Sequence, residues 1–229
     1  MSRKVVHLTL DHLAALDAPC RDCVFWQLDP VRRARVDLEG DAGEEKRAWL
    51  SAVLRDWGSC GRVVLVEGRP VGHVVYAPPA LLPSADAFPT SPVSPDAVLL
   101  ASAYVDPAHA GAGLGRLLVQ AMARDLVERG GYRAVEAFGR VDGPGAPGRR
   151  GRQCLLPADF LGRVGFGTRR AHGGVPRMRM DLRSALTWRD EVEVALERLR
   201  GVVRPAPARA PSPDARVPGT PRGVPGTEE

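Results

Sequence analysis

The amino-acid sequence predicts a mixed α/β domain, and three observations support this prediction. Two β-rich runs, residues 62–66 (RVVLV) and 71–76 (VGHVVY), are joined by turn residues and predict an antiparallel hairpin. A third run, residues 98–105, is stopped by Asp106 and Pro107, because proline has no amide hydrogen to continue a ladder. An amphipathic helix follows, so a β-α-β unit comes after the antiparallel start.

The helix after the third strand has the clearest period in the chain. Its apolar residues recur every three or four positions and Gly130 and Gly131 end it; these residues are Leu114, Leu117, Leu118, Ala121 and Met122. The remaining patterns predict helices at 12–16, 44–55, 158–164 and 187–200, and strands at 133–138 and 177–182. Two stretches rich in Pro, Gly, Ser, Ala or Arg, residues 78–95 and 141–153, are predicted to be mobile loops.

Composition predicts a single domain over residues 1–200, followed by a tail. The chain has 229 residues, of which 44% are hydrophobic, which is enough for one core. Residues 201–229 are rich in Pro, Gly, Ala and Arg and are predicted to be disordered. No window is apolar enough for a membrane span and no secretory signal is seen, so we expect a cytoplasmic protein. The net charge of +5 is spread along the chain, which argues against a nucleic-acid surface.

Residues 105–118 (VDPAHAGAGLGRLL) place Gly111, Gly113 and Gly115 between a strand end and a helix start. Residues without a Cβ let the backbone approach a ligand closely, and the first helix amides are unpaired donors at the positive end of the helix dipole. The turn therefore indicates a diphosphate site, to which Arg116 adds charge. The Lys-Ser/Thr pair of a P-loop and the G-x-G-x-x-G spacing of a dinucleotide fold are both absent here. A simple tight connection needs only one or two glycines.

The same segment matches the pattern V-x-P-x-x-R-G-x-G-[IL]-G, and at this point the sequence resembles the GNAT acetyltransferase superfamily. The matching residues are Val105, Pro107, Gly111, Gly113, Leu114 and Gly115. The element order is similar from about Val5 to Leu182, and residues 160–166 (FLGRVGF) are similar to the family's F-Y-x-K-x-G-F. The resemblance implies a single-domain, GNAT-like acyl-CoA N-acyltransferase fold whose sheet splays near Val105. It also implies acetyl transfer by direct attack of an amine on the thioester.

The resemblance implies acetyl-CoA as co-substrate, with its diphosphate on the turn and its pantetheine arm along residues 98–105. The expected binding residues are Val105, Ala110, Gly111, Ala112, Gly113, Leu114, Gly115 and Arg116. Ala110 replaces the family's usual Arg or Gln, which leaves the backbone cradle intact. The tyrosine that often protonates the departing thiolate aligns with Leu161, and an asparagine of the family aligns with Cys154. We expect an N-acetyltransferase; the alternative, favoured by Leu161, is a non-catalytic acyl-CoA-binding regulatory module.

Aminolysis of a thioester needs a group that removes a proton from the amine. Glu136, His73 and Asp106 are the candidates near the predicted sheet opening. Their ordinary interpretations are a solvated strand residue, a backbone-bonded histidine and a turn former before proline. Tyr104 is expected beside the thioester if the sheet splays at Val105, although packing is its ordinary role. We predict Glu136, Tyr104 and His73 as the catalytic residues.

Cys20 and Cys23 form a C-x-x-C motif, which suits either a metal site completed by Cys60 or a histidine, or a redox pair. Without a second such motif we expect no metal, and no structural disulfide among the four cysteines. A zinc- or thiol-dependent regulatory protein is the third hypothesis. Cys154 is either a packing thiol or an acyl-accepting nucleophile. The loop around it carries arginines that either screen the nucleotide 3′-phosphate or are solvated: Arg140, Arg149, Arg150 and Arg152.

The acceptor is expected to be an amine on a small molecule or a peptide, with no nucleic-acid or membrane partner. Residues 20–55 and the strands near the C-terminal end should choose it, but neither carries a motif tied to one substrate. The identity of the acceptor and the oligomeric state do not follow from the sequence.

Overall fold

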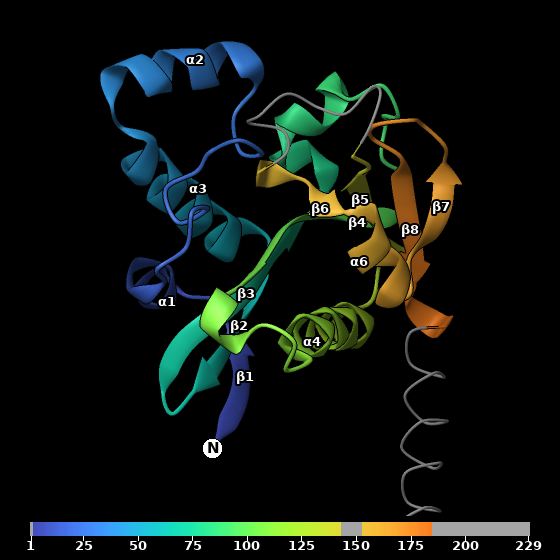
Figure 1. Cartoon of the computed structure of the whole chain (residues 1–229). Coiled ribbons are helices and arrows are strands. Elements are labelled where there is room, and N and C mark those ends of the chain that lie inside the picture. Colours follow the sequence, from blue (N-terminus) through green and yellow to red (C-terminus); the bar gives the residue numbers. More distant parts are fainter. Residues whose placement is uncertain (1, 143–152, 185–229) are drawn as a thin grey trace, which may run out of the picture. The chain divides into compact units, whose positions relative to one another are not determined.

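The computed structural model is built around one mixed β-sheet with helices on both faces (Figure 1). It describes residues 2–142 and 153–184. The predicted helix at 187–200, the predicted tail at 201–229 and most of the predicted loop at 141–153 lie outside these residues. Within the described ranges, none of the helices combines the length and the apolar character needed to cross a membrane.

The strands follow the order β1-β2-β3-β4-β5-β8-β7, and β6 pairs with β5. Their bounds are β1 Arg3–His7, β2 Gly61–Val66, β3 Arg69–Ala77, β4 Ala97–Val105, β5 Ala134–Arg140, β6 Leu156–Pro157, β7 Gly167–Arg170 and β8 Arg177–Asp181. The helices are α1 Leu10–Ala15, α2 Pro30–Glu39, α3 Ala42–Asp56, α4 Leu114–Arg129 and α6 Ala158–Arg163, and the 3-10 helices are η1 Pro79–Leu81, η2 Pro83–Ala87 and η3 Pro107–His109. The prediction of a mixed α/β sheet is confirmed.

The predicted hairpin is formed by β2 and β3, which pair antiparallel. Glu67 and Gly68 make the turn with φ values of 51° and 79°, which is the left-handed geometry of a two-residue hairpin turn. Sequence reasoning missed β1, β7 and α2. The signals for α2 were present, because Asp29 accepts hydrogen bonds from the amides of Val31 and Arg32 and Gly40 ends the helix at a φ of 86°.

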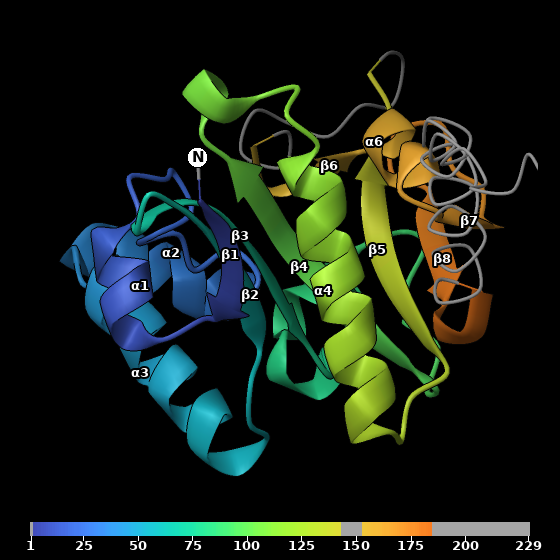
Figure 2. The same cartoon turned by 90° about the horizontal axis from the view of Figure 1, so that it is seen from below.

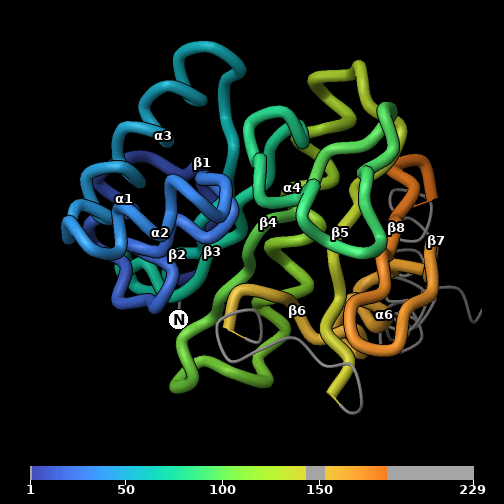
Figure 3. Tube along the Cα trace, turned by 90° about the horizontal axis from the view of Figure 1, so that it is seen from above, coloured from blue at the N-terminus to red at the C-terminus, as the bar shows by residue number. Residues whose placement is uncertain are grey.

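The two faces of the sheet follow the period-two alternation of the strands. On one face, Val64, Val74 and Tyr76 pack against the apolar stripe of α4. On the other face, Val63 and Val75 pack with residues of α1 and α3. Figure 3 shows α1, α2 and α3 grouped over the half of the sheet that contains β1 to β3.

Residues 78–95, predicted as a mobile loop, form η1 and η2 and cover the β4–β5 half of the sheet (Figure 3). Leu82, Ala85 and Val93 are buried with β4 residues and with Phe138. The prediction of a loop was wrong in this respect, because proline-rich sequence also starts short 3-10 helices whose few apolar residues fill a core.

Strands β4 and β5 are parallel and pair over three positions only, from Ala97–Ala134 to Leu99–Glu136. Beyond Leu99, β4 stays paired with β3 but no longer with β5, and β5 next pairs with β6 at Gly139. Figure 2 shows the two strands diverging with α4 lying across them. One backbone edge of β4, over residues 100–105, is therefore left without a neighbouring strand.

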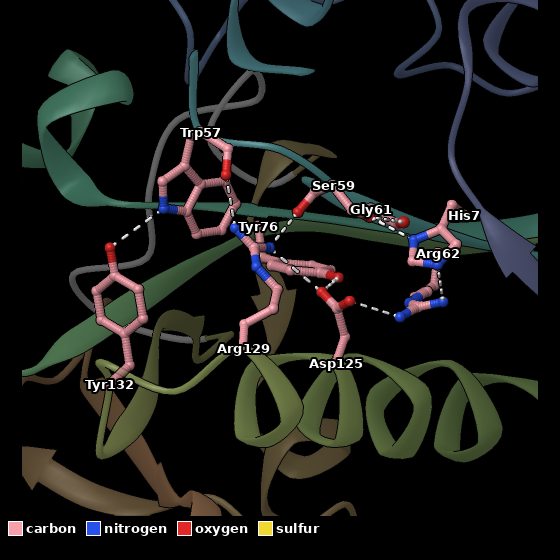
Figure 4. A network of polar contacts seen from close by, with 9 residues as sticks. All are labelled: His7, Trp57, Ser59, Gly61, Arg62, Tyr76, Asp125, Arg129 and Tyr132. Atoms are coloured by element: carbon pink, nitrogen blue, oxygen red, sulfur yellow. Dashed lines mark hydrogen bonds and ion pairs between the residues drawn. The ribbon is translucent and has the colours of Figure 1, made fainter. Parts of the chain in front are cut away.

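Helix α4 is held on the sheet by a polar network around Asp125 (Figure 4). The Asp125 carboxylate is 6% exposed, lies 2.6 Å from Nη2 of Arg62 and 3.4 Å from Nη1 of Arg129, and accepts a hydrogen bond from the Tyr76 hydroxyl. Burial and this hydrogen bond raise the pKa of Tyr76, so the phenol stays a donor. The network connects α4 to β2 and β3, which lie on the side of β4 away from β5.

We expect Asp125→Ala to lower the free energy of unfolding by about 3–5 kcal/mol, because it leaves Arg62 and the Tyr76 hydroxyl without their acceptor in a buried setting. Glu128→Ala, an exposed carboxylate on the same helix, should change it by less than about 0.5 kcal/mol. Urea unfolding of both variants measures the difference, and equal effects would contradict the assignment.

Candidate active site

The glycine turn joins the free edge of β4 to the N-terminus of α4. Asp106 caps the short helix η3 by accepting a hydrogen bond from the amide of Ala108 at 2.8 Å. Helix α4 then begins after Gly113, and no side chain caps it. Its first intrahelical bond runs from the amide of Leu117 to the carbonyl of Gly113. The amides of the preceding turn, at residues 114–116, therefore have no partner within the helix.

Each of the three glycines has its own structural reason. Gly111 and Gly113 have φ values of 75° and 76°, which disfavour residues with a Cβ, and the space around each is open. Gly115 has ordinary helical geometry, but a Cβ there would lie 3.0 Å from the ring of Phe160 on α6. The glycines therefore shape the turn and admit α6, and the case for a ligand rests on the exposed amides.

These amides face a cavity of about 580 Å³, here called the glycine-turn cavity. All predicted cofactor-binding residues except Ala112 are among its lining residues, which are Val105, His109, Ala110, Gly111, Gly113, Leu114, Gly115, Arg116, Phe160, Arg163 and Val164. Arg163 and His109 were not predicted. Arg163 lies in the FLGRVGF segment, at the position of the lysine in the family pattern, so the signal was available. Two guanidinium groups and a helix N-terminus make this cavity suitable for an anion.

A second cavity, of about 110 Å³, lies along the same strand and is here called the thiol-lined cavity. Its lining residues are Pro19, Cys20, Cys23, Trp26, Lys46, Ser102, Ala103, Tyr104, Gln153, Cys154 and Leu156. Because Val105 lines one cavity and the residue before it lines the other, β4 is a wall of both. The two cavities thus follow the strand edge that β5 leaves uncovered.

Tyr104 and His73, predicted as catalytic, lie together on neighbouring strands with ring centroids 6.1 Å apart. Tyr104 lines the thiol-lined cavity, and burial, with smaller contributions from Asp106 and other neighbours, raises its pKa. His73 is 1% exposed and lies behind the cavity wall, with Nε2 3.5 Å from Sγ of Cys20. Burial lowers the pKa of His73 to about 3, so its ring is neutral at pH 7.

Glu136, the third predicted catalytic residue, lies away from these two. It is fully buried, so its ordinary interpretation as a solvated strand residue was wrong. One carboxylate oxygen lies 3.2 Å from Nη1 of Arg179, and the other lies 3.4 Å from Nη1 of Arg177 and accepts a hydrogen bond from the amide of Ser94. These contacts engage both oxygens at the last β4–β5 pair, Leu99–Glu136.

Lys46 was missed by sequence reasoning and is the most deeply buried cation of the thiol-lined cavity. Its Nζ donates to the carbonyl of Cys23 at 3.0 Å, and burial lowers its pKa. The signal was its place on α3, four residues before Leu50 and seven before Val53, on the stripe that faces the core. A lysine on such a stripe can shift its charge state readily.

The four cysteines are thiols. Sγ of Cys23 lies 3.6 Å from Sγ of Cys154, and Sγ of Cys20 lies 3.5 Å from Nε2 of His73. Cys60 is buried in a separate cluster with β2 and α3. Within residues 2–142 and 153–184, no three His, Cys, Asp or Glu side chains are grouped as metal ligands.

Other predicted positions have ordinary roles. Leu161, aligned with the family's tyrosine, is fully buried in the core under α4. Asp106 acts as the turn former described above. Nε of Arg140 lies 3.5 Å from Asp142, and the other arginines of that loop are outside the described residues: Arg149, Arg150 and Arg152.

Comparison with known proteins identifies the fold and the family. The model of the acetyltransferase (GNAT) family matches residues 25–147, more than half of the chain. No curated protein matches. Similar solved structures include PaiA N-acetyltransferase from Thermoplasma acidophilum in complex with coenzyme A, which is 12% identical with a TM-score of 0.50 over 79% of this chain and 99% of that one.

Two further structures agree. The loading GNATL domain of CurA from Lyngbya majuscula is 14% identical with a TM-score of 0.51, over 80% of this chain and 100% of that one. AAC(6′)-Ib in complex with ribostamycin and coenzyme A is 14% identical with a TM-score of 0.50, over 82% and 97%. At these identities the structures establish the fold, and the family match together with this open, splayed sheet shows that the chain belongs to the GNAT acetyltransferase family.

Proposed function

We propose that this chain is an acetyl-CoA-dependent N-acetyltransferase that transfers an acetyl group directly to an amine on a small molecule or a peptide. One observation carries the proposal. The β4 edge that β5 leaves uncovered leads through the glycine turn to the uncapped N-terminus of α4. The thiol-lined cavity lies along the strand edge, and the glycine-turn cavity lies at the helix N-terminus. The family match supports the same activity.

The residues present fit coenzyme A. The diphosphate would accept hydrogen bonds from the amides at residues 114–116, with Arg116 and Arg163 as counter-charges. The amide groups of the pantetheine arm match the uncovered backbone edge of β4, as an added strand would. On this path we propose that the thioester end lies beside Tyr104, which lines the thiol-lined cavity.

The transfer forms a C–N bond between the amine and the acetyl carbonyl carbon and breaks the C–S bond to coenzyme A. The departing thiolate needs a proton, and Tyr104 is our candidate donor, because it lines the thiol-lined cavity and its phenol is protonated at neutral pH. Of the three base candidates from the sequence, Glu136, His73 and Asp106, none lines the thiol-lined cavity. We propose that the acceptor binds as the free amine and that water takes the proton it loses.

We propose supporting roles for the other two predicted catalytic residues. His73 is a neutral positioning residue behind Tyr104 and Cys20. Glu136 of β5 forms ion pairs with Arg177 and Arg179 of β8 and accepts a hydrogen bond from the amide of Ser94. These contacts hold β5 in place up to the point where β4 and β5 diverge. A non-catalytic acyl-CoA-binding module remains the second candidate, favoured by the buried leucine at the tyrosine position and by the three base candidates lying outside the cavity.

The first prediction concerns coenzyme A binding. Ala110 lines the glycine-turn cavity, is exposed and has a φ of −62°, so a larger side chain fits without backbone strain. We expect Ala110→Glu to weaken coenzyme A binding at least about tenfold through repulsion of the diphosphate. Ala110→Gln has the same size without the charge and should stay within about threefold. Isothermal titration measures both, and equal affinities for the two variants would refute the diphosphate site.

The second prediction concerns the proton donor. Tyr104→Phe should lower kcat by about 10²-fold or more with a panel of amines, while the KM for acetyl-CoA stays within about threefold. The control is Tyr132→Phe, whose hydroxyl contacts Trp57 away from both cavities. An unchanged kcat in Tyr104→Phe would remove the tyrosine from the mechanism. Coenzyme A binding without turnover of any amine by the wild type would favour the binding module.

The third prediction concerns pH. The pKa of His73 is about 3 in the fold and about 6.5 when unfolded, so between these values only the unfolded chain binds the proton. The stabilisation is complete above about pH 6.5 and is lost as the pH falls, by about 2 kcal/mol at pH 5. Urea unfolding at about pH 7.5 and pH 5 should show this loss in the wild type and in His12→Gln, a control at a partly exposed histidine on α1. The loss should be smaller by that amount in His73→Gln, and an identical loss in all three would contradict it.

A further inference from the structure

Three thiols from two distant parts of the chain converge on the thiol-lined cavity. Cys20 and Cys23 come from the segment between α1 and α2, and Cys154 comes from the segment before β6. The sulfurs of Cys23 and Cys154 are 3.6 Å apart although 131 positions separate the residues. Nothing in the proposed acetyl transfer uses this pair, so its proximity needs a separate explanation.

Two hydrogen bonds hold the backbones of the pair in place. Nε1 of Trp26, three residues after Cys23, donates to the carbonyl of Cys154 at 3.2 Å. Nζ of Lys46 donates to the carbonyl of Cys23 at 3.0 Å and so fixes that residue to α3. The Trp26 ring in turn stacks on Phe138 of β5, with centroids 6.0 Å apart. The two sulfurs are thus brought together by a packed frame.

The environment of Cys154 favours its thiol form. A hydrogen bond to Cys23 is the main cause that raises the pKa of Cys154, with burial second. The Cys154 thiol therefore keeps its proton beside the Cys23 sulfur.

We propose that Cys23 and Cys154 are a reversible oxidative modification site, at which a peroxide converts the two thiols into a disulfide across the thiol-lined cavity. Loss of a proton from Cys23 gives the thiolate that hydrogen peroxide oxidises to a sulfenic acid with release of hydroxide, and the Cys154 thiol then displaces water from it to form the S–S bond. In balance, the two thiols lose two protons and two electrons, and one hydrogen peroxide becomes two waters. A thiol reductant reverses the step.

The disulfide would change the cavity in which we place acetyl transfer. It would tie the α1–α2 segment to the segment before β6, and residues of both segments line this cavity together with Tyr104 of β4. Both sulfurs also line a neighbouring cavity of about 320 Å³ with Phe25 and Arg33, so the link lies between the two spaces. The glycine-turn cavity has none of these cysteines. Oxidation should therefore reduce transfer to the amine and spare coenzyme A binding, an effect that rests on the proposed function.

The test is peptide mapping of the full chain under non-reducing conditions after treatment with hydrogen peroxide and alkylation of the remaining thiols. We expect a linked peptide pair containing Cys23 and Cys154, an intact mass lower by two hydrogens, and recovery of both thiols with dithiothreitol. Cys60→Ser, which removes a buried thiol elsewhere, and Cys20→Ser should leave the link intact. Cys23→Ser and Cys154→Ser should each abolish it, and circular dichroism shows whether each variant is folded.

A linked Cys20–Cys23 peptide, or oxidation of the thiols to sulfinic acids with no linked peptide, would overturn the proposal. If a variant does not fold, the peptide map of the wild type alone decides between these outcomes. The effect on function is measured by titrating coenzyme A into the oxidised protein and assaying acetyl transfer before and after reduction. We expect the oxidised protein to bind coenzyme A but to lose acetyl transfer, and we expect reduction to restore the transfer. Equal transfer by both forms would refute the effect on the cavity, whereas no transfer by either form would count against the proposed function and leave the peptide result unaffected.

Discussion

The short pairing of β4 with β5 is the constraint on which the site depends. Three residue pairs hold the two parallel strands together, and beyond them the strands diverge. Parallel strands need every buried amide and carbonyl to be satisfied, so an edge left uncovered in the middle of a sheet must meet water or a ligand. Here that edge leads to a helix N-terminus whose amides are also unsatisfied within the helix. The strand edge and the helix N-terminus both offer backbone groups, and these do not depend on the side chain at Ala110, where the family has a longer polar residue.

The divergence is stabilised from both ends. At the paired end, the buried Glu136 carboxylate joins two arginines of β8 to the backbone at Ser94 and so fixes β5 between its neighbours. At the other end, β6 takes the partner position on β5 that β4 has left. Gly139 lies where the segment of α6 approaches, because a Cβ there would be 3.2 Å from Cβ of Ala158. The Asp125 network holds α4 to β2 and β3, so the helix stays with the β4 half of the sheet.

Burial decides which of the polar residues near the opening can take part in chemistry. His73 and Glu136 both lie close to the opening in the sheet. However, the His73 ring is desolvated behind the wall of the thiol-lined cavity, and the Glu136 carboxylate is held in ion pairs with arginines. Tyr104 differs because it lines the cavity, although burial favours the neutral form of its phenol just as it favours the neutral ring of His73. The groups that the sequence could not connect, Cys23, Cys154 and Lys46, share the same small cavity from three separate elements.

The sequence by itself determined what depends on local pattern. The hairpin, the strand before the glycine turn, the amphipathic helix and the cavity-lining residues of the turn all follow from spacing, period and backbone chemistry within about fifteen residues. The weaker patterns misled: β1 has too few apolar residues to signal an edge strand, and the proline-rich segment at 78–95 hides core positions such as Leu82. Only the tertiary structure decided which face of a strand is covered, so the burial of Glu136 could not be predicted. The pairing of Cys23 with Cys154 rather than with Cys20 was likewise decided there, because contacts across 131 positions are set by how the sheet and its loops pack and leave no trace in local spacing.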